Sequence, residues 1–291
     1  MIKRLFFMFI LSTFTFNAIH TNQDDVNAIV CASSQDTYQK INENWKYVAV
    51  NGILSTESEY WEAKWINNNA NTNGGIGRSA TLILKTDPKH IIEALVDLIN
   101  KPASLECTIA LTTAKILCLK EILGEEKLKD FATRFYSLIT QSPRISNINI
   151  EGFFHELPLQ FISTFEGNPI PGSIAYLTNL DKYTTIKPNG NARGLNVFCV
   201  NLDQYIAFDH IFENNPQSIV IIRQDQFESF CEESDVEHNK EAHTRLCTMF
   251  NTKSDMFFTL VQNQQEKNFN FYQFFDEAKI NEFIEEGAVE Y

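Results

Sequence analysis

The segment PASLECTIALTTAKILCLKEILGEEKLKDFATRFYSLIT, residues 102–140, has the clearest helical pattern in the chain. Ser104 is a favoured N-cap residue, so the pattern predicts a helix in which Cys107 falls at about the third position. The apolar stripe of this helix continues through Ile109, Ala110, Thr113, Ile116 and Leu117. Gly124 ends it. A second helix is predicted from Glu125 to about Thr140, because its first turn is acidic, as the helix dipole favours.

The flanking segments predict an α+β fold. Upstream, residues 24–57 are polar and predict loops with one helix or strand. Residues 79–85 then predict a strand and residues 89–100 a helix. Downstream of Pro143 come short strand-like segments, at residues 173–177, 195–200, 204–208 and 218–223. Helices followed by an antiparallel sheet are typical of the α+β class.

Length and charge limit the classes of function. The 291 residues suffice for one large domain or two small ones, and 44% of them are hydrophobic, as in a globular protein. The 37 acidic and 24 basic residues give a net charge of −13, so we expect no nucleic-acid partner. Residues 211–291 alone hold 16 acidic and 6 basic residues. The excess charge therefore belongs mainly to the last part of the chain.

The N-terminal 20 residues resemble an export signal. Lys3 and Arg4 precede an apolar run from Leu5 to about Ile19, which is short for a membrane span. Ala18 is the only nearby small residue for cleavage, so an uncleaved anchor or a buried first helix are the alternatives. No later segment is long and apolar enough to cross a membrane. We expect a secreted or periplasmic protein whose mature chain has no membrane span.

The cysteines predict neither a metal site nor a cofactor. No CxxC or Cys/His spacing occurs among the six of them, Cys31, Cys107, Cys118, Cys199, Cys231 and Cys247. Cys231 and Cys247 flank one polar segment and could pair in an oxidising compartment. Cys118 follows Cys107 by about three helical turns, and we predict that it is a core residue.

A nucleophilic site is one interpretation of Cys107. A thiol near a helix N-terminus is favoured as thiolate by the helix dipole, and the free backbone N–H groups there can hold an oxyanion. The nucleophile needs a base, and His210, at the end of a predicted strand, is the candidate. Asp203, Asp209 or Glu106 could orient or assist that base. The alternative is an ordinary buried cysteine, since free cysteine is among the most buried residue types.

The residues around Cys107 resemble a known family. The runs Leu105-Glu106-Cys107-Thr108 and Ile122-Leu123-Gly124-Glu125-Glu126-Lys127-Leu128 are similar to the cysteine-bearing helix of the small protein-glutamine gamma-glutamyltransferases (transglutaminases) of spore-forming bacteria. Further matches follow that order: Tyr60-Trp61, Leu157-Pro158, the strand from Gly172 to Tyr176, Arg193-Gly194 with Asn196-Val197, and Asp203 with Tyr205 and Ala207. The resemblance covers about residues 60–210.

This resemblance implies a papain-like (transglutaminase/NlpC-type) core, in which a cysteine at a helix N-terminus packs on an antiparallel sheet. It also implies acyl transfer from a protein Gln side chain to a Lys amine. The chain departs from the family at two positions: Leu195 stands where the family has a catalytic Glu, and Phe208 where it has its His. His210 lies two residues further, on the same strand face, and Glu106 could replace the missing carboxylate. His155 is the reserve base, its alternative being a solvated loop histidine.

Taken together, these observations predict three segments: a signal peptide at residues 1–20, a transglutaminase-like core at 21–210, and an acidic C-terminal extension at 211–291 packed on or beside the core. The predicted function is thiol-dependent acyl transfer through Cys107, with a protein Gln as donor and a Lys amine or water as acceptor. A papain-like peptidase or amidase is an alternative that uses the same Cys and His. Leu195 favours another alternative, a secreted interaction protein that has lost the chemistry.

Overall fold

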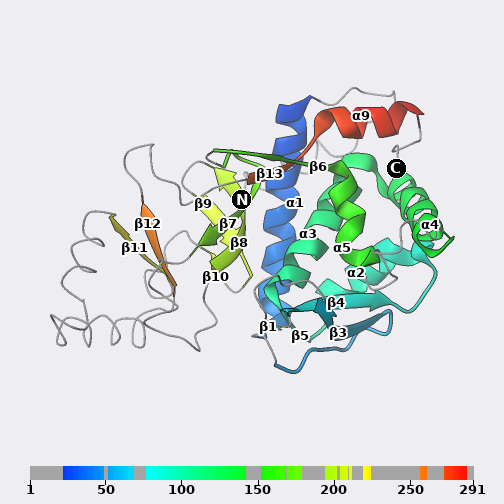
Figure 1. Cartoon of the computed structure of the whole chain (residues 1–291), viewed down its shortest axis with the longest axis horizontal. Coiled ribbons are helices and arrows are strands. Elements are labelled where there is room, and N and C mark those ends of the chain that lie inside the picture. Colours follow the sequence, from blue (N-terminus) through cyan, green and yellow to red (C-terminus); the bar gives the residue numbers. More distant parts are fainter. Residues whose placement is uncertain are drawn as a thin grey trace, which may run out of the picture.

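The structure is a computed structural model (Figure 1). It describes residues 22–48, 52–68, 77–141, 152–167, 169–178, 194–201, 204–208, 210–211, 219–223, 256–260 and 272–286. The predicted signal peptide, Asp203 and the predicted Cys231–Cys247 pair lie outside the described residues. No helix among the described residues is long and apolar enough to cross a membrane.

The helices form one side of the molecule and the main sheet lies beside them (Figure 1). The helical elements are α1 (Gln23–Asn44), η1 (Pro88–His90), α2 (Ile91–Ile99), α3 (Cys107–Leu123), α4 (Glu125–Gln141), α5 (Phe153–Glu156), η2 (Leu157–Phe161) and α9 (Glu277–Glu286). Helix α3 is central: it packs against α1, α2, α4 and β8, and most of its side chains are buried.

Four sheets lie within the described residues, and the largest is entirely antiparallel. Its six strands have the order β10-β9-β8-β7-β13-β6: β10 (His210–Ile211), β9 (Gln204–Ala207), β8 (Gly194–Asn201), β7 (Ile174–Thr178), β13 (Tyr272–Phe275) and β6 (Ile162–Phe165). The smaller sheets are formed by β1 (Trp45–Tyr47), β5 (Ala103–Leu105) and β2 (Ser55–Thr56); by β3 (Trp61–Asn68) and β4 (Gly77–Leu84); and by β11 (Ile219–Arg223) and β12 (Met256–Leu260). The predicted α+β class is confirmed.

Several predicted elements are found close to their expected bounds. The strand predicted at 79–85 is β4, and the helix predicted at 89–100 is α2. Gly124 ends α3 with a φ of 81°, a conformation that glycine adopts without a side-chain penalty. The three strands predicted between residues 173 and 208 pair antiparallel as β7, β8 and β9.

Two predictions were wrong. Residues 24–57 do not consist mainly of loops, because the 22-residue helix α1, Gln23–Asn44, occupies most of them, with Asn22 as its N-cap. Ser104 is not the N-cap of the cysteine-bearing helix. It lies in β5, whose backbone pairs with β1 and β2, so the helix starts later. Glu106 is the N-cap and Cys107 is the first helical residue.

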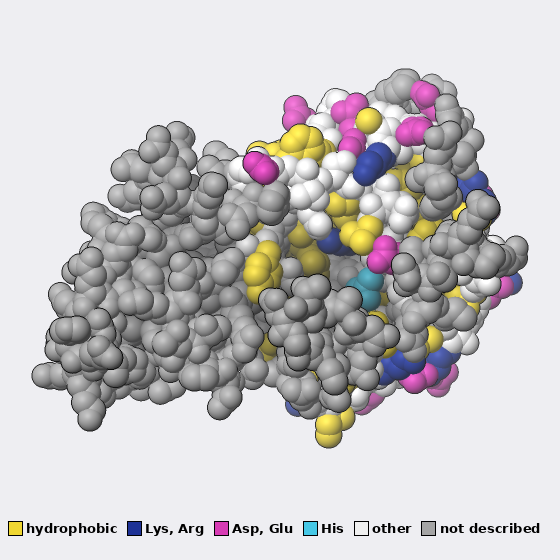
Figure 2. Space-filling model, viewed as in Figure 1, with side chains coloured by type: hydrophobic (Ala, Val, Ile, Leu, Met, Phe, Trp, Pro, Cys, Tyr) yellow, Lys and Arg dark blue, Asp and Glu magenta, His cyan; other side chains and the backbone are white. Residues whose placement is uncertain are grey.

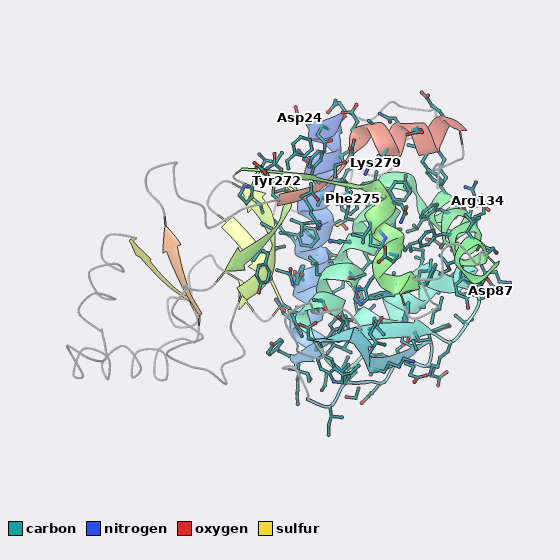
Figure 3. All side chains as sticks on the ribbon, in the orientation of Figure 1. Asp24, Asp87, Arg134, Tyr272, Phe275 and Lys279 are labelled. Carbon is teal, nitrogen blue, oxygen red and sulfur yellow. The ribbon has the colours of Figure 1, made fainter. Side chains whose placement is uncertain are left out.

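The last described residues belong to the body of the fold. Strand β13 pairs with β6 on one side and β7 on the other, and Phe275, at its end, is fully buried. Lys279 of α9 donates to the Ile162 carbonyl at 2.7 Å, and both Phe275 and Lys279 are labelled in Figure 3. Figure 2 shows acidic side chains gathered where α9 lies, on its solvent-facing side. Part of the predicted acidic extension therefore completes the central sheet.

The sheet meets helix α1 at a close contact that only glycine permits. Gly172, just before β7, has a φ of 82°. A Cβ atom built there would lie 2.6 Å from the Asn27 Cα atom and 2.7 Å from its carbonyl oxygen. Helix α1 is therefore packed directly against the start of β7.

Candidate functional site around Cys107

The first turn of α3 places a thiol against a carboxylate. Glu106 caps the helix: one carboxylate oxygen accepts from the Thr108 backbone N–H at 2.8 Å and also from the Thr108 hydroxyl. The other carboxylate oxygen accepts from the Cys107 Sγ–H at 2.8 Å. The capping requirement of the helix thus fixes the carboxylate directly beside the thiol.

An amide from the sheet completes this group. Asn196 lies on β8, paired with Tyr176 of β7, and its Nδ2 is 3.9 Å from Cys107 Sγ. Helix α3 and strand β8 pack together, which brings residues 89 positions apart into contact. The sequence offered Asn196 only as a match in the family resemblance, so its contact with the thiol was missed.

The thiol of Cys107 is held in its protonated form. Burial is the largest factor that raises its pKa, followed by the charge of Glu106 and the hydrogen bond to it. The hydrogen bond with Asn196 lowers the pKa, but by less. The thiolate predicted at this helix N-terminus is therefore disfavoured, because the thiol is buried and because the Glu106 carboxylate, which already accepts from the Thr108 N–H, places a negative charge beside the sulfur.

His155 is not a solvated loop histidine. It lies in α5 and is half-buried, with Nε2 2.9 Å from the Ala80 carbonyl and Nδ1 3.0 Å from the Thr112 hydroxyl. A carbonyl only accepts, so Nε2 donates to Ala80 and the neutral ring accepts from Thr112 at Nδ1. Burial lowers the pKa of His155, which keeps this arrangement neutral. Both ring nitrogens are thus occupied by structural partners.

The structure describes the remaining predicted site residues only in part. His210 belongs to β10, at the sheet edge, where its backbone pairs with Ala207 of β9; its side chain is outside the described part, as is that of Leu195. Phe208, which the resemblance would align with the family's His, is buried and makes edge-to-face contacts with Trp45 and Tyr47, each with ring centroids 6.0 Å apart. The side chain at position 208 is therefore part of an aromatic cluster.

Cys118, on the same helix, is a core residue as predicted. It is fully buried, and its Sγ lies 3.9 Å from the Val30 carbonyl. The four cysteines in the described part of the chain, Cys31, Cys107, Cys118 and Cys199, are free thiols. Among the same residues no group of three or more His, Cys, Asp or Glu side chains could hold a metal ion.

A surface groove of about 610 Å³ lies elsewhere on the molecule. It is lined by residues of η1, α2 and α4, including Lys89, Glu93 and Lys129, and it shares no residue with the Cys107 group. Its lining mixes both signs of charge, and Lys129 is already paired with Glu93 and Glu125. The groove therefore contributes nothing to the chemistry at Cys107.

No protein-family model matches the chain, and no curated protein matches it. The functional assignment therefore depends on the residues and on their geometry.

Proposed function

We propose that the chain is an exported thiol acyltransferase of the transglutaminase type, with a papain-like core and with Cys107 as its nucleophile. One observation carries the proposal: the cysteine that the family resemblance singles out is the first residue of a buried helix, 2.8 Å from a carboxylate and next to an amide on an antiparallel sheet. Nucleophile, proton acceptor and hydrogen-bond donor are the groups that acyl transfer requires.

In the proposed reaction, the Sγ of Cys107 attacks the side-chain carbonyl carbon of a protein Gln, and the thiol proton passes to Glu106. The C–N bond then breaks, and ammonia leaves with a proton returned by Glu106. A Lys amine next attacks the thioester and forms an isopeptide bond, which frees the thiol. Water in place of the amine gives deamidation.

The side chain of Asn196 suits the oxygen that becomes negative in this reaction. Its Nδ2 group is a hydrogen-bond donor beside the sulfur, where the tetrahedral carbon forms. His210 and Asp203 remain predicted assistants of proton transfer, with His210 at the edge strand β10. Burial and the Glu106 carboxylate raise the pKa of the Cys107 thiol. Attack therefore begins only when substrate binding lets the thiol proton move onto Glu106.

Two observations favour a second candidate, a protein that keeps the fold without the reaction. The pKa of Cys107 is raised, and Phe208, which the resemblance would align with the family's base, packs against Trp45; together they describe a thiol at rest. Such a protein would bind its partners without modifying them.

A single assay distinguishes the two candidates. The full chain is incubated with casein and a tagged primary amine, or with a tagged Gln peptide, and both incorporation and ammonia release are measured. The proposal expects both signals in the wild type and in Cys118→Ala, and neither in Cys107→Ala. Peptide-bond cleavage dependent on Cys107 would instead indicate a peptidase. The proposal fails if a folded wild-type chain gives no incorporation and no ammonia.

A further inference from the structure

A second reactive pair lies deeper in α3. Lys115 has 6% of its surface exposed, and its Nζ donates to the Oε1 atom of Gln273 at 3.0 Å. Gln273 comes from β13, the strand between β6 and β7. A buried lysine is normally paired with a carboxylate. Among the described residues, Lys115 forms no ion pair, and burial alone accounts for the shift of its pKa.

Among the described residues, no carboxylate neutralises this amine. His155 of α5 interacts with it electrostatically, and burial keeps that ring neutral, with Thr112 and Ala80 as its hydrogen-bond partners. Burial lowers the pKa of Lys115 to about 8. Roughly one molecule in ten therefore has a neutral, nucleophilic amine at pH 7.

We propose that Lys115 and Gln273 join in an intramolecular isopeptide bond. The lone pair of the neutral Nζ attacks the Cδ atom of Gln273, which is one bond away from the oxygen that Nζ already contacts. The bond between Cδ and Nε2 breaks, Nε2 leaves as ammonia with a proton given up by Nζ, and a secondary amide remains. The step consumes no oxidant, reductant or other reactant.

The fold supplies what this reaction needs. It holds the amine and the amide in contact between α3 and β13, so the two groups react at a high effective concentration. The amine is buried and the Gln273 side chain is half-buried, which limits the access of water to the reacting carbon. The product also removes a buried charge that no carboxylate among the described residues offsets. The cross-link would connect residues 158 positions apart and attach the last described strand to the central helix.

This inference is independent of the proposed function, because neither Cys107 nor Glu106 takes part. The measurement is peptide mapping by mass spectrometry of the denatured full-length wild type. We expect a branched peptide that contains both Lys115 and Gln273 and is lighter than the sum of its two parts by one ammonia. Cys107→Ala should give the same branched peptide, since the attack does not pass through a thioester.

Three variants complete the test. Gln273→Met and Lys115→Met should each abolish the branched peptide. Lys279→Met should keep it, because the Lys279 amine donates to a backbone carbonyl, that of Ile162, and does not contact Gln273 among the described residues. Separate, unmodified peptides with a freely labelled Lys115 amine in the wild type would overturn the proposal, whatever the variants do. Loss of the branched peptide in a folded Cys107→Ala protein would overturn the direct attack.

Discussion

The two cysteines of α3 have the same helix in common and differ in almost everything else. Cys107, in the first turn, contacts a carboxylate and an amide, whereas Cys118, three turns later, lies in the core beside the Val30 carbonyl and the Ser33 side chain. Burial is the largest factor that raises both thiol pKa values, to about 12 for Cys118. The comparison shows that burial alone does not distinguish a candidate nucleophile from a packing residue. The polar groups that contact the sulfur distinguish them.

The largest expected effect concerns stability in alkali. An unfolded thiol loses its proton near pH 9, while Cys118 in the folded chain keeps it until about pH 12. As the pH rises above 9, deprotonation of the thiol stabilises the unfolded state relative to the native state. Each such thiol therefore lowers the free energy of unfolding by about 1.4 kcal/mol per pH unit. Urea titrations from pH 8 to 11 should show a smaller loss in Cys118→Ala and in Cys107→Ala than in the wild type.

Comparison with the wild type cancels the titration of all other groups in this experiment. An unchanged slope in Cys107→Ala, with a reduced slope in Cys118→Ala, would mean that the thiol of Cys107 is not held protonated.

The charge beside each thiol can be removed separately. Glu106→Gln deletes the carboxylate that raises the pKa of Cys107, and Glu121→Gln deletes the charge that acts on Cys118. We expect alkylation of Cys107 at neutral pH to rise about tenfold in Glu106→Gln, which corresponds to one pKa unit. Peptide-resolved mass spectrometry of iodoacetamide-treated protein measures it.

Glu121→Gln is the matched control, because Cys118 stays fully buried whatever its neighbouring charge. Its alkylation should stay as slow as in the wild type. An equal rise in alkylation at Cys118 in Glu121→Gln and at Cys107 in Glu106→Gln would contradict the proposed difference between the two thiols.

The stability lost through packing should be larger for Cys118 than for Cys107. Cys118→Ala leaves a cavity in the core and should lower the unfolding free energy at pH 7 by about 1 kcal/mol. Cys107→Ala should cost less, because Cys107 is partly exposed. Denaturant unfolding measures the two losses of stability, as shifts of the midpoint at an unchanged m-value. A larger loss in Cys107→Ala would contradict the assignment of Cys118 as the packing residue.

The smallest expected effect comes from the sheet. The Asn196 amide lowers the pKa of Cys107, so Asn196→Leu should slow its alkylation by a factor of about two to three, the effect of a few tenths of a pKa unit. Alkylation of Cys118 should not change. A faster reaction at Cys107 would show that Asn196 shields the sulfur and does not stabilise its negative form.

Local sequence patterns predicted much of the fold. Helices α2, α3 and α4 and the antiparallel strands β7 to β9 have strong periodic or β-branched patterns, and Gly124 marks a helix end. Helix α1 was missed because its buried face includes polar residues such as Ser34 and Thr37, which weaken the apolar period. The start of α3 was misplaced because β5 uses the backbone around Ser104 for pairing, a long-range effect that no local pattern contains.

The candidate site shows the same limit. Cys107 and Glu106 are neighbours in sequence, so their association was predictable. Asn196 and Gln273 reach α3 from strands 89 and 158 positions away, and only the sheet order brings them there. Lys115 is a charged residue within an apolar helix, and nothing near it in the sequence indicates its partner.

The position of β13 has a consequence for the order of events during synthesis. Strands β6 and β7 do not pair with each other; β13 lies between them. At translation speeds of about 5 to 20 residues per second, the nascent chain waits several seconds after β7 for that strand to emerge. During this interval two strand edges have unsatisfied backbone groups, which are open to pairing with other chains. A chaperone that covers nascent chains would therefore matter most while residues 179–271 are being made.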